Sequence, residues 1–111
     1  MKTLKLTIGS RIPDNFTGII EYENGAKEWY KNGRFHREDG PAKIRSNGFK
    51  EWWLDGEFIY AAVRGNLNKD KIILSKDPHP LYPTVQVWKY IDENGIREQI
   101  MIPGMEDYII E

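Results

Sequence analysis

The chain has 111 residues, of which 40% are hydrophobic and 13% aromatic, a composition typical of one compact folded domain rather than of a disordered chain. Sixteen basic and seventeen acidic residues give a formal net charge of −1, which argues against a protein that coats duplex DNA by neutralising many phosphates. Because the chain has no cysteine, disulfide frameworks and thiolate zinc sites are excluded.

The first residues predict a strand and no targeting signal. Residues 2–8 alternate between polar and apolar side chains and lack the continuous apolar stretch of a signal peptide. No run in the chain approaches the roughly 20 apolar residues of a membrane helix. We therefore expect a cytoplasmic protein without a membrane partner.

Five glycine turns follow at regular intervals. They are Asn24-Gly25, Asn32-Gly33, Asp39-Gly40, Asn47-Gly48 and Asp55-Gly56. Asn-Gly and Asp-Gly favour the type I′ turn, in which both central residues have a positive φ. The segments between the turns have the usual length of strands and are rich in β-forming residues. This pattern predicts a mainly β fold, an antiparallel β-meander of repeated hairpins.

The hairpin pattern is also an internal repeat. Residues 24–33 and 47–56 both read Asn-Gly-x-Lys-Glu-Trp, then an aromatic residue and a closing turn, with a displacement of 23 residues. Such self-similarity is typical of stacked supersecondary units. We expect a single domain over 1–111. It would contain hairpin repeats at 9–59, an insertion or connector at 60–86, and a degenerate third repeat with C-terminal strands at 87–111.

The region after the repeats is less regular. Residues 66–74 fit either a helix or a strand, so the 60–76 region is where one short helix is expected if the chain has one. Residues 77–83 contain three prolines and predict a rigid connector. Residues 97–102 predict a further strand, and the tail at 108–110 is apolar enough to dock.

Residues 22–42 read Tyr-Glu-Asn-Gly-Ala-Lys-Glu-Trp-Tyr-Lys-Asn-Gly-Arg-Phe-His-Arg-Glu-Asp-Gly-Pro-Ala. This stretch resembles the "NG-x-KEWY-x-NG-x-x-HREDGPA" repeat of many phage and bacterial proteins, which is similar to variant MORN repeats. The second copy departs from the pattern after Gly56, so the resemblance covers residues 17–59, with a weaker likeness at 85–98. It implies one β-hairpin per copy and a binding or scaffolding surface.

By analogy, the resemblance suggests several functions. A chain of this kind looks like a small phage-type accessory protein that acts in the host cytoplasm. It would bind and inhibit a host protein, such as a defence-system nuclease or ribonucleoprotein complex, as anti-CRISPR proteins do. The alternatives are a single-stranded nucleic-acid or nucleotide binder and an antitoxin-like or scaffolding repeat protein. An uncovered edge strand would also allow a homodimer.

Five residues are the candidates for contact with a protein partner. Tyr30 and Trp53 would be the desolvated anchors, and Lys27, Arg34 and Arg37 would orient the partner. Strand alternation places aromatic side chains on both faces of the sheet, so some of them are expected in the core. The same aromatic residues could also form a stacking platform for bases.

The cluster His36-Arg37-Glu38-Asp39 contains catalytic residue types. A general base needs an orienting carboxylate and a nearby nucleophile, but this cluster belongs to a repeat and ends at a turn. We therefore expect His36 or Arg37 to bond Glu38, Asp39 or the backbone around the turn. His36 and His79 lie 43 residues apart, which is unlike the spacing of a metal site. We expect no enzymatic activity, metal or cofactor.

Overall fold

The computed structural model describes residues 2–7, 9–62, 72–93 and 95–105. This part of the chain contains ten strands and no helix, which confirms a mainly β fold of antiparallel, hairpin-like strands. It therefore includes no helix that could cross a membrane. Residues 63–71 of the region where a helix was expected, and the tail at 108–110, lie outside the described residues.

The chain forms two compact units, and each has its own sheet. Unit 1 consists of Met1–Arg37 and Pro41–Val63, and unit 2 consists of Glu38–Gly40 and Arg64–Glu111. The predicted insertion at 60–86 contributes strands to both, because β7 (Glu57–Ala62) belongs to unit 1 and β8 (Ile72–Pro78) to unit 2.

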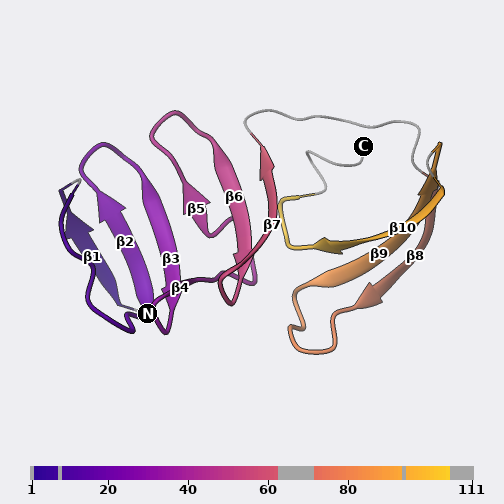
Figure 1. The fold of residues 1–111 in the computed structure, drawn as a ribbon, viewed down its shortest axis with the longest axis horizontal. Coiled ribbons are helices and arrows are strands. Elements are labelled where there is room, and N and C mark those ends of the chain that lie inside the picture. The colour runs from indigo at the N-terminus through magenta and orange to yellow at the C-terminus, as the bar shows by residue number, and fades with distance from the viewer. Residues whose placement is uncertain (1, 8, 63–71, 94, 106–111) are drawn as a thin grey trace. The chain divides into compact units, whose positions relative to one another are not determined.

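Unit 1 is a seven-stranded sheet in the order β1-β2-β3-β5-β6-β7, with β4 also paired to β3 (Figure 1). Its further strands are β1 (Thr3–Leu6), β2 (Gly18–Tyr22), β3 (Lys27–Lys31), β4 (Arg34–Phe35), β5 (Lys43–Ile44) and β6 (Lys50–Leu54). All neighbouring strands are antiparallel except β1, which runs parallel to β2. The parallel pair is possible because residues 7–17 carry the chain back to the start of β2.

Four of the five predicted turns close hairpins, with two geometries. At Asn32-Gly33 and Asp55-Gly56 both residues have a positive φ, as a type I′ turn requires. At Asn24-Gly25 and Asn47-Gly48 only the glycine has a positive φ, of 92° and 89°. This second geometry is typical of a type I turn followed by a left-handed glycine.

The predicted turn at Asp39-Gly40 is wrong. Neither residue has a positive φ, and residues 36–42 form a loop between β4 and β5, which both pair with β3. Trp29 holds the two ends of this loop: its N–H donates to the carbonyl of Ala42 (2.7 Å), and its carbonyl accepts the N–H of His36 (3.0 Å). Because β4 and β5 follow two halves of the same neighbour in the same direction, the chain does not reverse here.

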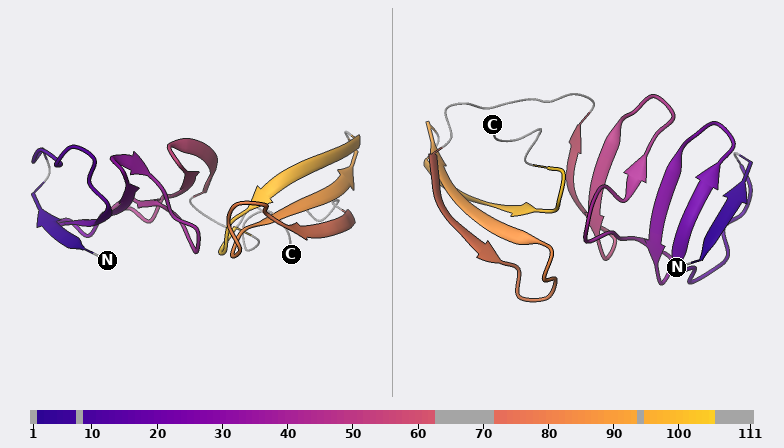
Figure 2. Two further views of the ribbon diagram at one scale, coloured as in Figure 1. Left: turned by 90° about the horizontal axis from the view of Figure 1, so that it is seen from below. Right: turned by 180° about the vertical axis from the view of Figure 1, so that it is seen from behind.

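Unit 2 contains a three-stranded antiparallel sheet in the order β10-β9-β8 (Figure 2). β9 spans Gln86–Asp92 and β10 spans Gly95–Met101, so the strand predicted at 97–102 is present. The rigid connector predicted at 77–83 begins later than expected, because Asp77 and Pro78 belong to β8. A proline is tolerated there because β8 is an edge strand.

Candidate functional site

Five aromatic rings form a continuous row on one face of the unit 1 sheet. In order they are Phe16, Tyr30, Phe35, Trp53 and Phe58, and successive ring centroids are 6.3, 4.9, 5.2 and 5.4 Å apart. Strand pairing produces part of this row, because Tyr30 lies opposite Phe35 and Trp53 lies opposite Phe58. We call the row the aromatic ladder, and the face that carries it the ladder face.

The exposure of the ladder increases toward β7. Phe16 is buried, Tyr30, Phe35 and Trp53 are half-buried, and Phe58 is 51% exposed. A row of packed rings with accessible faces is a feature of binding surfaces, because rigid aromatic side chains lose little entropy on contact.

Two glutamates beside the ladder accept hydrogen bonds from its polar atoms. Oε1 of Glu28 accepts from the hydroxyls of Tyr22 (2.8 Å) and Tyr30 (2.9 Å). Oε1 of Glu51 accepts from the indole N–H of Trp53 (3.1 Å), and its Oε2 accepts from Nε and Nη2 of Arg45 (3.2 and 3.1 Å). These contacts fix the rings and leave the indole N–H and both hydroxyls satisfied.

The same positions of the two sequence copies build these two clusters. Glu28 and Glu51 differ by 23 residues, and so do Tyr22 and Arg45, which donate to them. Two residues after each glutamate, a ring donor returns to the same carboxylate. Each Lys-Glu-Trp segment therefore carries one buried or nearly buried acid that organises the ladder face.

The hydrogen bonds to Glu28 keep two phenols neutral. Burial and the nearby carboxylate raise the pKa of Tyr22 from 10.0 to about 12. The same causes, burial first, raise the pKa of Tyr30. A phenol with a raised pKa remains a hydrogen-bond donor near neutral pH, so these tyrosines are suited to positioning and not to acting as phenolate nucleophiles.

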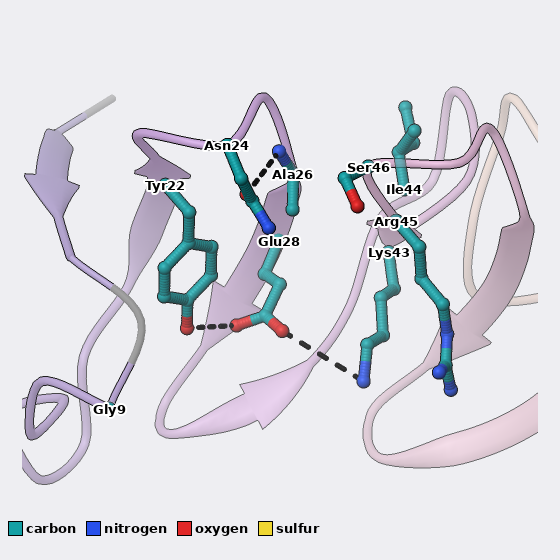
Figure 3. Close-up of a pocket in the computed structure, with 9 residues that line it drawn as sticks. All are labelled: Gly9, Tyr22, Asn24, Ala26, Glu28, Lys43, Ile44, Arg45 and Ser46. Carbon is teal, nitrogen blue, oxygen red and sulfur yellow. Dashed lines mark hydrogen bonds and ion pairs between the residues drawn. The ribbon is translucent and has the colours of Figure 1, made fainter.

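A pocket of about 360 Å³ opens beside Glu28 (Figure 3). Tyr22 and Glu28 form one wall, and Lys43 and Arg45 approach from β5 and the residue that follows it. Nζ of Lys43 lies 3.9 Å from Oε2 of Glu28 and 5.2 Å from the ring centroid of Phe35. Because Glu28 already has three partners, the pocket is better suited to a small polar side chain than to a free cation.

The structure divides the predicted contact residues between the two faces of the sheet. Tyr30 and Trp53 both belong to the ladder, with the ring of Phe35 between them. Lys27 lies on the opposite face, because it is separated from Tyr30 by an odd number of positions on β3. Arg34 pairs with a residue of that opposite face and is exposed.

Arg37 also lies on the opposite face. Its guanidinium carbon is 4.0 Å from the ring centroid of Trp29, and Nη1 donates to the carbonyl of Pro41 (3.1 Å). Lys27 is 3.6 Å from Glu21 on the neighbouring strand. The five predicted residues therefore do not form one surface, and only the two aromatic ones share a face.

His36 caps the turn of the next hairpin. It is 7% exposed, and its Nδ1 accepts the N–H of Asp55 at 2.8 Å. Thr17 has the same role one hairpin earlier, since its Oγ1 accepts the N–H of Asn32 at 2.9 Å. This contact fits a structural role for His36, although the backbone that it binds belongs to a turn further along the chain than expected.

Sequence reasoning did not select three of the five ladder rings or the two glutamates. Phe16 and Phe35 could have been found, because each precedes a capping residue and accepts a turn glycine N–H through its carbonyl, from Gly33 and Gly56 at 2.9 Å. Phe58 gave no comparable signal, because the repeat pattern has already ended there.

The described residues contain no group of three or more His, Cys, Asp or Glu side chains placed to hold a metal ion. Comparisons with models of protein families, with curated proteins and with solved structures find no match to this chain.

Proposed function

We propose that this chain is a non-catalytic protein-binding module whose partner docks on the ladder face. The observation that carries the proposal is the ladder itself, a row of five rings that ends in the 51% exposed Phe58. Protein-binding energy is concentrated in a few such aromatic anchors. The resemblance of residues 17–59 to phage repeats suggests that the partner is a host protein and that binding inhibits it.

The ladder face is prepared for a partner before contact. Glu28 and Glu51 hold Tyr30 and Trp53 by hydrogen bonds, so these rings have little freedom left to lose. The pocket beside Glu28 adds a recess for a polar side chain next to the apolar row. An anchored apolar row with a polar recess is the arrangement expected at the centre of a specific interface.

The charges of this face support a protein partner over single-stranded nucleic acid. A nucleic-acid platform combines stacked rings with free cations that follow the phosphates. Here Lys43 is paired with Glu28 and Arg45 with Glu51. The exposed basic residues Lys27 and Arg34 lie on the other side of the sheet.

The test compares the chain with a variant of its most exposed ladder ring. The full chain and its Phe58→Ala variant are used as bait in a nuclease-treated bacterial lysate, and retained proteins are identified by mass spectrometry. Leu81→Ala is the matched control, because Leu81 is 73% exposed and lies in unit 2. Circular dichroism confirms that both variants are folded.

We expect one protein to be retained by the unchanged chain and by Leu81→Ala, with affinity for Phe58→Ala reduced about tenfold or more. If no protein distinguishes Phe58→Ala from the control, the ladder is not the docking surface. Steeply salt-dependent quenching of tryptophan fluorescence by oligonucleotides would favour the nucleic-acid alternative instead.

A further inference from the structure

The sheet of unit 2 has one covered face and one apolar face that is open. Trp88 and Tyr90 point to the covered face and are 7% and 6% exposed. On the other face, Ile72, Ile91 and Ile96 stand in one row across β8, β9 and β10. Ile72 is 63% exposed and Ile96 is 65% exposed. Solvent-facing positions of antiparallel sheets are normally polar, so this row is unusual.

Two further cross-strand pairs share this face with Ile91 and Ile96. Lys89 lies opposite Glu98, with Nζ 3.9 Å from Oε1. Val87 lies opposite Ile100, and both are half-buried. We call these three pairs of β9 and β10 the isoleucine face.

We propose that the isoleucine face is the contact surface of a homodimer. A two-fold axis parallel to the strands and midway between β9 and β10 exchanges the two strands. It places Ile91 of one copy over Ile96 of the other, Lys89 over Glu98, and Val87 over Ile100. The pairing already present along the hairpin is thereby reproduced between the copies, as an isologous interface requires.

Charge complementarity identifies a second copy as the occupant. Lys89 and Glu98 are 48% and 64% exposed, and each finds its opposite charge on the second copy. An axis along β9 would instead place Lys89 over itself, and like charges at that distance are unfavourable. The contact involves two strands per copy, which is less than a standard interface, so the dimer should form reversibly with concentration.

This inference is independent of the proposed function, because the aromatic ladder belongs to the sheet of unit 1. The test is sedimentation equilibrium of the full chain from about 10 µM to about 1 mM, the range expected for an interface of less than standard size. We expect the average mass to rise toward that of a dimer. The variant Ile96→Glu should raise the dissociation constant about tenfold or more.

Ile72→Glu is a matched control, because Ile72 has the same residue type, row and exposure as Ile96 but lies on β8, outside the two exchanged strands. It should change the dissociation constant much less. Lys89→Glu should weaken the dimer, and Lys89→Glu combined with Glu98→Lys should restore it. A monomer at all concentrations, equal effects of the two isoleucine variants, or failure of the charge exchange to restore dimerisation would each overturn the proposal.

Discussion

Replacing His36 should lower stability rather than abolish a reaction. His36 is buried, and its Nδ1 accepts the N–H of Asp55, which closes the type I′ turn of the last hairpin of unit 1. His36→Ala removes this hydrogen bond, worth about 1 kcal/mol because the half-exposed turn can recruit water in its place. Emptying the volume of the buried ring adds about 1–2 kcal/mol. We expect a total loss of about 2–3 kcal/mol.

Thr17→Ala is the matched control. Thr17 caps the preceding type I′ turn with the same kind of hydrogen bond but is exposed. Its replacement should therefore cost only the hydrogen-bond term, about 0.5–1 kcal/mol. The difference between the two variants measures the contribution of ring burial.

Urea unfolding followed by circular dichroism gives the two stability changes, and amide hydrogen exchange reports the turn directly. The amide of Asp55 should lose protection in His36→Ala but not in Thr17→Ala. An unchanged free energy of unfolding in His36→Ala, with Asp55 still protected, would refute the capping role. Loss of a biological function in such a stable variant would revive a catalytic role for His36.

Three further predictions concern the turns and the glutamate clusters. Gly33→Ala should destabilise by about 2 kcal/mol or more, since φ is +77° and the new Cβ would meet the backbone of the preceding loop at 3.2 Å; Gly25→Ala has nothing within 4 Å and should cost only about 1 kcal/mol in urea unfolding. Stability should fall as the pH rises from 10.0 toward 12, because Tyr22 ionises in the unfolded chain before it does in the folded one. Tyr22→Phe should flatten that decline in alkaline titrations. Glu51→Ala should cost about 2 kcal/mol in urea unfolding, because it orphans the indole N–H of Trp53.

The turns were predictable from sequence because their chemistry is local. Asn32-Gly33 and Asp55-Gly56 adopt the expected positive φ at both residues, which few other dipeptides tolerate. Asp39-Gly40 has the same composition and spacing but lies in a loop held by Trp29 of another strand. Its conformation depends on which strands pair, and that information is not local.

The candidate site was less predictable for the same reason. Alternation correctly separates Tyr30 from Lys27, because the two residues share one strand. It cannot relate Arg34 or Arg37 to that strand without the pairing register. The ladder is a relation among five segments of the chain, so its outer rings become visible only once the strands are aligned.

The end of the hairpin array and the exposed end of the ladder have a common origin. In the repeat, Phe35 supplies a ring and His36, the next residue, caps the following turn. After a displacement of 23 residues these positions are Phe58 and Ile59. Phe58 preserves the ring, but the side chain of Ile59 has no acceptor with which to cap another turn. The ladder consequently ends in a ring packed on one side only, against Trp53, and its other side is left for a partner.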